Sequence, residues 1–121
     1  MLRRPRRPIA APATPVVDEA PPRTFGDLEI DVAGRDVRVG GAPIDLTRTE
    51  FDVLEALSAR PRLAFSRRQL IEAVWGDKWI GDEHLVDVHI GHVRRKLGDD
   101  AGRPRFIRTV RGVGYRMGDG Q

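Results

Sequence analysis

Hydrophobic residues alternate with polar ones in the first part of the chain that shows any periodicity. They occupy every second position in residues 28–32 and again in residues 37–39, with acidic or basic residues between them. A period of two is typical of strands that bury one face. Residues 43–46 follow a Gly-Gly turn, and Pro43 favours a sheet edge because proline has no amide hydrogen to donate. We therefore expect a small antiparallel sheet with an acidic outer face.

The hydrophobic period then lengthens to that of an α-helix. Thr47–Glu50 and Ser66–Gln69 both have the pattern of a capping box, in which two side chains bond to free amides of the first turn. An apolar stripe follows each box, so one helix is expected after Thr47 and a second after Ser66. A third helix is expected at about residues 82–97, and Gly98 is placed to end it.

The third helix is expected to have two different faces. At 100° per residue, His89 falls on the apolar face and is interpreted as a packed histidine. The opposite face has an exposed Val88 and a Gly91, at which glycine costs about 1 kcal/mol relative to alanine. Close approach of another surface and a neutral surface position both explain Gly91. The mixed hydrogen-bonding groups of this face suit DNA base edges, and Val88 suits a thymine methyl group.

The chain ends in an expected β-hairpin. Residues 106–110 and 115–117 resemble strands, and Gly112 and Gly114 lie in the tip loop, where glycine permits a positive φ. Strands, three helices and a hairpin predict an α+β fold of the winged helix-turn-helix type. The major groove of DNA admits one helix, and the negative potential of the minor groove favours a loop with an arginine at its tip.

Charge is distributed unevenly along the chain. Residues 1–23 contain five arginines and six of the nine prolines, which predicts a flexible interdomain linker and leaves residues 24–119 as one domain. Residues 24–59 have three basic and eight acidic residues, whereas residues 60–121 have thirteen basic and eight acidic residues. A basic half beside an acidic half favours a polyanionic partner, although two solvated surfaces explain it equally well.

Several functional classes are not supported by the sequence. The absence of cysteine excludes disulfides and thiolate zinc sites, and no apolar run approaches the roughly 18 residues of a membrane span. The basic N-terminus lacks the apolar region of a secretory signal. The three histidines do not share a helix face, and no nucleophilic triad, phosphate-binding loop or carboxylate pair is evident. We expect a cytoplasmic domain that is not an enzyme and has no metal or cofactor.

Four motifs in a fixed order resemble the winged-helix effector domains of OmpR/PhoB-type response regulators in two-component systems. They are residues 46–54, residues 66–70 with 74–76, residues 86–90 with 94–97, and residues 107–116. The resemblance covers about residues 24–117, and the ordered combination is highly specific. Met1–Arg4 also resembles the end of the last receiver helix, so we expect this chain to be the effector half of a two-domain regulator.

The resemblance, together with the polar helix face and the arginines of the hairpin, implies two sets of DNA contacts. Base contacts are expected from Asp87, Val88, Gly91, His92, Arg95 and Arg111, with Arg111 in the minor groove. Phosphate contacts are expected from Trp75, Arg94, Arg108, Thr109, Tyr115 and Arg116. The loop expected to contact RNA polymerase is made of Gly76, Asp77, Lys78, Trp79, Ile80 and Gly81.

Some of these roles have alternatives. Asp87 can accept a hydrogen bond from cytosine, hold Arg94 or Arg95 in position, or do both. Trp75 is expected to lie mostly in the core. The Tyr115 ring is expected to pack inside the domain while its hydroxyl reaches a phosphate. Gly91-His92 departs from the longer basic pair that relatives commonly have, which weakens any inference about the bases read.

The function implied is sequence-specific binding of double-stranded DNA by a transcriptional regulator that acts on RNA polymerase. Such domains usually bind as homodimers on tandem direct-repeat sites, under the control of their own receiver domain and a cognate sensor kinase. The alternative is a winged helix that docks onto a protein without reading DNA. DNA binding predicts that five arginines, Arg94, Arg95, Arg108, Arg111 and Arg116, point in one direction.

Overall fold

The computed structural model describes residues 21–76, 79, 81–100 and 102–121. The first strands, β1 (Arg23–Phe25), β2 (Leu28–Asp31), β3 (Asp36–Val39) and β4 (Ala42–Ile44), form an antiparallel sheet in chain order. The helices are α1 (Arg48–Ala59), α2 (Arg67–Val74) and α3 (His84–Leu97). The remaining strands, β5 (Phe65–Ser66), β6 (Ile107–Val110) and β7 (Gly114–Met117), form a second sheet in the order β5-β7-β6.

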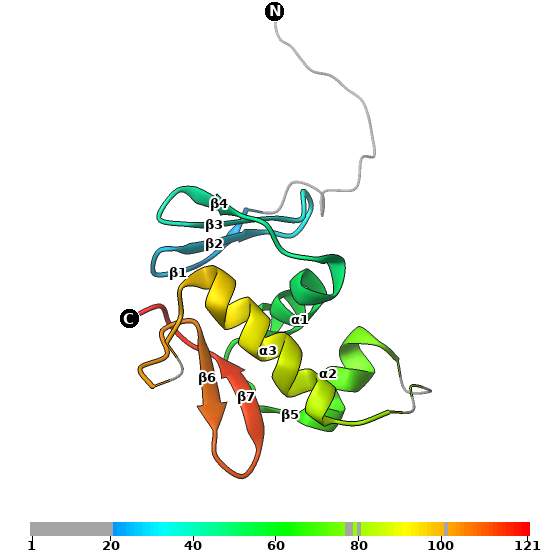
Figure 1. Ribbon diagram of the computed structural model, residues 1–121. Helices are drawn as coiled ribbons and strands as arrows, with labels where there is room; N and C mark the ends of the chain where they lie inside the picture. Colours follow the sequence, from blue (N-terminus) through cyan, green and yellow to red (C-terminus); the bar gives the residue numbers. More distant parts are fainter. Residues whose placement is uncertain (1–20, 77–78, 80, 101) are drawn as a thin grey trace, which may run out of the picture.

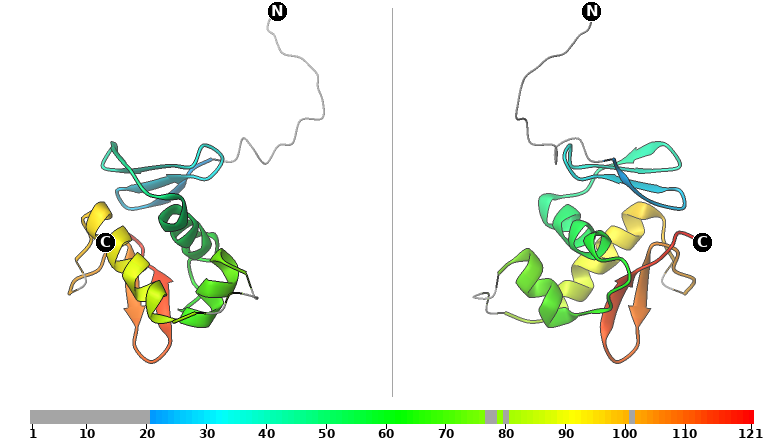
Figure 2. Two further views of the ribbon diagram at one scale, coloured as in Figure 1. Left: turned by 45° about the vertical axis from the view of Figure 1, so that its right-hand side comes forward. Right: turned by 180° about the vertical axis from the view of Figure 1, so that it is seen from behind.

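The four-stranded sheet lies at one end of the domain and the β6–β7 hairpin at the other (Figure 1). The helices lie between them in all three ribbon views, and α3 crosses the molecule from the hairpin side to the sheet side (Figure 2). This is the predicted α+β winged helix-turn-helix architecture, in which the hairpin is the wing.

Local signals in the sequence set the starts of α1 and α2. The Thr47 hydroxyl accepts from the Glu50 amide at 3.2 Å, and the Glu50 carboxylate accepts from the Thr47 amide at 2.9 Å. Ser66 and Gln69 form the same reciprocal pair at 2.8 and 3.0 Å. Both predicted capping boxes are therefore confirmed, and they fix where each helix leaves the preceding chain.

The two ends of α3 are not set by a capping box. Asp82 lies outside the helix, and its carboxylate accepts from the His84 amide at 2.9 Å, so α3 begins two residues later than expected. Gly98 ends the helix as predicted. It has φ 73°, and its amide donates to carbonyl groups of the last turn.

A single apolar core connects the two sheets through the helices. Each helix buries one stripe against it, and the inward residues of β2, β6 and β7 close its two ends. Its fully buried members are Leu28, Ile30, Val53, Leu54, Leu57, Leu70, Ile71, Val86, Val93 and Ile107. The core thereby fixes α3 against both α1 and the wing, which sets the position of its exposed face.

Residues near both edges of the expected domain make specific contacts with the rest of the fold. Arg23, placed in the linker by the sequence, belongs to β1, and its guanidinium donates to the Ser58 hydroxyl at 2.9 Å and the Glu55 carbonyl at 3.1 Å. At the other end, the Gly120 amide donates to the Arg105 carbonyl at 2.9 Å. Among the described residues, such contacts therefore extend from Arg23 to Gly120, and residues 1–20 of the expected linker lie outside the described residues.

The sequence did not reveal β5, which is only two residues long. It pairs with β7 through Phe65 opposite Tyr115 and Ser66 opposite Gly114. A Cβ on Gly114 would collide with the Phe65 carbonyl oxygen. Close packing against β5 therefore explains Gly114, whereas Gly112 has the positive φ, 80°, expected of the tip loop.

Candidate nucleic-acid interface

The two faces of α3 are separated as the helical spacing predicted. Val86, Ile90, Val93 and Leu97 are buried, whereas His84, Val88, Gly91 and Arg95 are exposed. Val88 is 48% exposed, so this face presents an apolar side chain as well as polar groups to an external partner. Arg95 makes no hydrogen bond or ion pair with any described residue, so its guanidinium is available to an external partner.

Gly91 lies at the centre of this exposed face. A Cβ built on it would meet no atom within 4 Å, and its φ is not in the left-handed region. Neither packing inside the domain nor backbone conformation therefore requires glycine here. What glycine provides is a low point in the helix surface, where another surface can approach closely.

Asp87 lies at the edge of this face and is engaged within the protein. Its Oδ1 accepts from Arg67 Nε of α2 at 2.8 Å and from the Tyr115 hydroxyl of β7. Its Oδ2 lies 3.4 Å from His84 Nδ1. The expectation that Asp87 holds Arg94 or Arg95 is wrong, because the arginine at its carboxylate comes from α2.

The pKa values in this cluster follow from its geometry. Partial burial by itself raises the pKa of Asp87, but the hydrogen bonds from Arg67 and Tyr115 outweigh burial and hold it below its ordinary value. Burial and the neighbouring carboxylate raise the pKa of Tyr115. At neutral pH Asp87 is therefore an acceptor and Tyr115 a donor, as their contact requires.

Arg94 ties α3 to the wing. Its Nη2 donates to the Ile107 carbonyl and to the Thr109 hydroxyl, both at 2.8 Å, and its guanidinium lies 5.6 Å from the centre of the Tyr115 ring. Arg94 and Thr109, both expected to contact phosphate, thus lie side by side where the wing meets the helix. The Tyr115 ring is buried, as predicted.

The five arginines do not all point in one direction, and that expectation is wrong for Arg108 and Arg116. These two residues are direct partners across the hairpin, as are Thr109 and Tyr115. Successive strand residues point to opposite faces, and Thr109 and Tyr115 face α3. Arg108 and Arg116 therefore lie on the far face of the wing.

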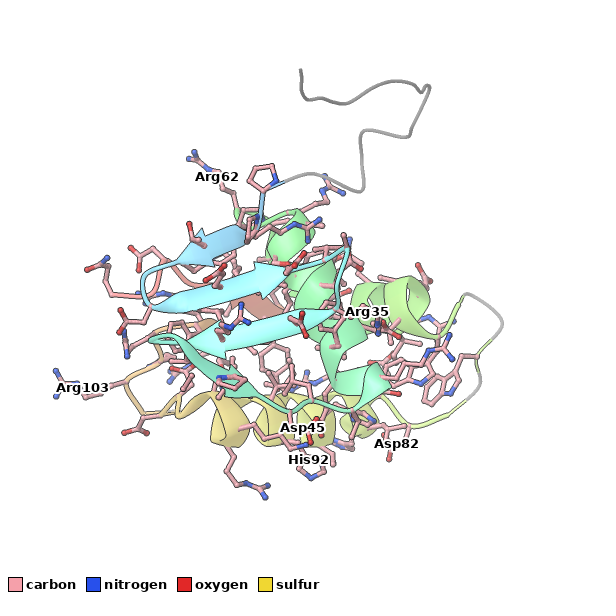
Figure 3. All side chains as sticks on the ribbon, turned by 90° about the horizontal axis from the view of Figure 1, so that it is seen from above. Arg35, Asp45, Arg62, Asp82, His92 and Arg103 are labelled. Atoms are coloured by element: carbon pink, nitrogen blue, oxygen red, sulfur yellow. The ribbon has the colours of Figure 1, made fainter. Side chains whose placement is uncertain are left out.

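The far face of the wing forms a basic hollow that the sequence analysis did not anticipate. It is lined by Pro61, Arg62, Arg108, Arg116, Met117, Gly118 and Asp119. Arg62 lies on the side of the molecule opposite to His92 of α3 (Figure 3). The alternation of side chains along β7 could have predicted this, because the exposed Arg116 follows the buried Tyr115 and must point to the opposite face of the wing.

The tip of the wing has both charge and apolar surface. Arg111 is exposed and has no partner among the described residues, and Val113 is 45% exposed. The intervening Gly112 turns the chain tightly. The tip of the wing is thus a tight turn with the Arg111 guanidinium beside it.

His92 is tied to α1 through Glu50, a contact that sequence reasoning missed. Its Nδ1 lies 3.6 Å from Glu50 Oε2, and Lys96 Nζ lies 2.7 Å from Glu50 Oε1. The His92 side chain is still 43% exposed, so it also borders the outward face of α3. Glu50 was recognised as part of a capping box, and its second role depends on residues 42 and 46 positions away in sequence.

The region after α2 contains Trp75, which packs against the core, and the loop expected to contact RNA polymerase. Trp75 is half-buried and packs against the core, as predicted, with its ring 5.7 Å from that of Trp79 and 5.4 Å from that of His89. His89 is therefore a packed histidine. Of the six residues expected to contact RNA polymerase, Asp77, Lys78 and Ile80 lie outside the described residues.

The described residues contain neither a metal site nor a membrane-spanning helix. No group of three His, Asp or Glu side chains there could hold a metal ion. No helix in that part of the chain is both long and apolar enough to cross a membrane.

Comparison with known proteins places this geometry in a family. Residues 41–117 match the family model described as "Transcriptional regulatory protein, C terminal". The chain is 49% identical over 92 residues to the transcriptional regulatory protein PrrA of Mycobacterium tuberculosis, covering 76% of this chain and 39% of PrrA. It is 46% identical over 94 residues to CseB of Streptomyces coelicolor, covering 78% and 38%. The chain thus spans about two fifths of the length of these curated relatives.

Solved structures agree with the family model. The RstA DNA-binding domain of Klebsiella pneumoniae, solved in complex with the RstA box, has 35% identity and a TM-score of 0.74, covering 81% of this chain and 97% of that one. DrrB of Thermotoga maritima, an OmpR/PhoB homologue, has 35% identity and a TM-score of 0.73, covering 80% and 44%. The chain therefore belongs to the OmpR/PhoB-type family of C-terminal DNA-binding domains of response-regulator transcriptional proteins.

Proposed function

We propose that this domain binds double-stranded DNA in a sequence-specific manner, with α3 in the major groove and the tip of the wing in the adjacent minor groove. The observation that carries the proposal is the exposed face of α3, which combines Val88, open space at Gly91, and an Arg95 that has no partner among the described residues. This mixture of apolar and polar groups matches the base edges that the major groove displays.

The base-contacting set is proposed as Val88, Gly91, His92 and Arg95 on α3, with Arg111 at the wing tip. The low surface at Gly91 allows the helix backbone to approach the groove floor. Arg111 projects from a narrow tip and suits the enhanced negative potential of an A·T-rich minor groove. Asp87 was placed in this set by the sequence, and its contacts inside the protein support a different role, which is argued below.

Phosphate contacts are proposed on both faces of the wing. Arg94 and Thr109 lie where the wing meets α3, and the backbone between the two grooves would pass there. A further phosphate contact is proposed from Trp75, which follows α2 and packs against His89 of α3. A hairpin whose tip enters the minor groove has a phosphate backbone on each side. Arg108 and Arg116 therefore suit the backbone on the far side, since they project from the opposite face of the wing.

The wider role proposed is regulation of transcription by RNA polymerase, without catalytic activity of its own, in the cytoplasm. The relatives are named as transcriptional regulators, and a similar domain was solved in complex with DNA, which favours a DNA reader over a protein-docking module. A receiver domain in the same full-length protein, a cognate sensor kinase and a homodimer on tandem sites complete the proposal. The loop at residues 76–81 is proposed to meet RNA polymerase.

Selection from a random duplex library at moderate salt tests the function directly. The wild-type domain should enrich a direct repeat with half-sites about 10–11 bp apart. Arg111→Ala, selected in parallel, should bind more weakly and lose preference for A·T pairs flanking each half-site. Arg38→Ala is the matched control, because Arg38 is exposed on the four-stranded sheet at the end of the domain away from the wing.

Two results would contradict parts of this proposal. If the wild type enriches nothing even at low salt, the domain does not read DNA and the docking alternative gains support. If Arg111→Ala keeps the same flanking preference, the wing tip does not enter the minor groove.

A further inference from the structure

We propose that Asp87 is a positioning residue that fixes the wing relative to α3, the helix proposed to enter the major groove, and that it does not read a base. The inference rests on the proposed DNA-binding function and refines it. It concerns the point where α2, α3 and β7 meet, which we call the Asp87 junction and define as Arg67, Asp87, Tyr115 and Arg94.

One oxygen of the Asp87 carboxylate, Oδ1, is already occupied within the junction. Oδ1 accepts both the Arg67 guanidinium and the Tyr115 hydroxyl, and Oδ2 faces His84. The side chain is only 29% exposed. A contact of cytosine with Oδ1 would have to compete with a charge-assisted hydrogen bond at 2.8 Å, which is among the stronger kinds of hydrogen bond, and the Arg67 and Tyr115 contacts hold the carboxylate toward α2 and the wing.

The geometry connects the two DNA-reading elements through one side chain. Tyr115 lies on β7 of the wing, opposite Thr109, with the Arg94 guanidinium 5.6 Å from its ring centre and the Arg67 guanidinium 6.0 Å from it. Arg94 then continues to the Thr109 hydroxyl on the neighbouring strand. Asp87 neutralises part of this positive charge and holds the Tyr115 hydroxyl, so it determines the angle at which the wing leaves α3.

This arrangement has a consequence for specificity. The recognition helix keeps its base-reading side chains when Asp87 is changed, but the wing loses its fixed orientation. Removal of the carboxylate should therefore weaken the minor-groove preference that depends on Arg111 and leave the major-groove preferences intact. If Asp87 reads a base instead, its removal should weaken one major-groove preference and leave the minor-groove preference intact.

The test compares Asp87→Asn, Asp87→Ala and Tyr115→Phe on the DNA site selected by the wild type. Affinity is measured for that site and for every single base-pair substitution within it. We expect each variant to bind about three- to tenfold more weakly, the range of one hydrogen bond. The flanking A·T preference should decline, and the major-groove preferences should stay unchanged. Asn retains one acceptor for Tyr115, so Asp87→Asn should be the milder change.

The asparagine variant separates the two roles sharply. An aspartate accepts a hydrogen bond from cytosine N4, whereas an asparagine pairs with adenine. If Asp87 reads a base, Asp87→Asn should therefore change the preferred base from C to A at one position of the DNA site. Such an exchange would overturn the inference. The double variant Asp87→Ala/Tyr115→Phe should bind little worse than either single variant, because both remove the same contact. Fully additive losses, or unchanged affinity in Asp87→Ala, would also overturn it.

A matched control and a stability measurement complete the design. Asp52→Asn breaks an ion pair of the same length, 2.8 Å to Arg35, at similar exposure, but on α1. It should leave both affinity and base preferences unchanged. Thermal unfolding of each variant verifies that it is folded under the binding conditions. Failure of the wild type to select any site would be seen before any variant is compared, and would overturn the proposed function and this inference together.

Discussion

Glu50 shows how one buried carboxylate can serve two helices. Its side chain is 5% exposed, and it accepts from the Thr47 amide at the start of α1 and from Lys96 near the end of α3. Burial by itself raises the pKa of Glu50, but the hydrogen bonds from Lys96 and Thr47 outweigh burial and place it below its ordinary value. A depressed folded-state pKa means that Glu50 contributes stability above its unfolded pKa and loses it as the pH falls through the folded value.

Glu50→Gln should therefore lower the free energy of unfolding at pH 7 by about 1–2 kcal/mol, since it removes the charge that pairs with Lys96, while the amide oxygen still accepts from the Thr47 amide as Gln69 does from Ser66. It should also flatten the loss of stability below about pH 4.5, the ordinary value for glutamate. Urea denaturation at a series of pH values measures both effects. Glu83→Gln is the control, because Glu83 is exposed and makes no side-chain capping bond. Parallel acid profiles for Glu50→Gln and the wild type would show that Glu50 does not carry this dependence.

At the scale of elements, one glycine lies within α3 and another directly follows it, and the two occupy opposite kinds of backbone environment. Gly98 has φ 73° and ends the helix, whereas Gly91 has an ordinary φ and open space where a Cβ would stand. A side chain is strained at the first position and tolerated at the second. The cost of Gly91 to helix stability therefore needs an explanation outside the isolated domain.

Gly91→Ala should raise the free energy of unfolding by about 0.5–1 kcal/mol, the difference in helix propensity. Gly98→Ala should lower it by about 1 kcal/mol, because alanine is strained in the left-handed conformation. Chemical denaturation measures both. If α3 approaches the groove floor at Gly91, the more stable Gly91→Ala will bind the selected site more weakly. Unchanged affinity would make Gly91 a neutral surface position.

Contacts between residues close in sequence were predictable, whereas contacts between distant residues were not. The starts of α1 and α2 were predictable because Thr47 and Ser66 bond to residues three positions away. The core face of α3 was predictable from its period. The contacts of Asp87 with Arg67 and Tyr115 were not, because they join residues 20 and 28 positions apart. Local patterns specify elements, whereas the junctions between elements depend on tertiary packing.

For the whole molecule, net charge along the sequence was an incomplete guide to the interface. Residues 60–121 are basic as predicted, but this half supplies two surfaces. Arg95 lies on the exposed face of α3, whereas Arg62, Arg108 and Arg116 surround the hollow behind the wing. Charge counts cannot separate these surfaces, because the direction of a strand side chain depends on register and not on composition.

Salt dependence can determine whether both surfaces meet DNA. Each phosphate contact that is lost should reduce the slope of log K against log salt by about one. We expect this reduction for Arg116→Ala, with affinity falling about evenly for all sequences, since phosphates carry no base information. Arg38→Ala should leave the slope unchanged, because Arg38 lies on the sheet at the opposite end of the domain. An unchanged slope for Arg116→Ala would restrict the DNA contacts to the α3 side of the wing, and the hollow around Arg62 would then face away from the duplex.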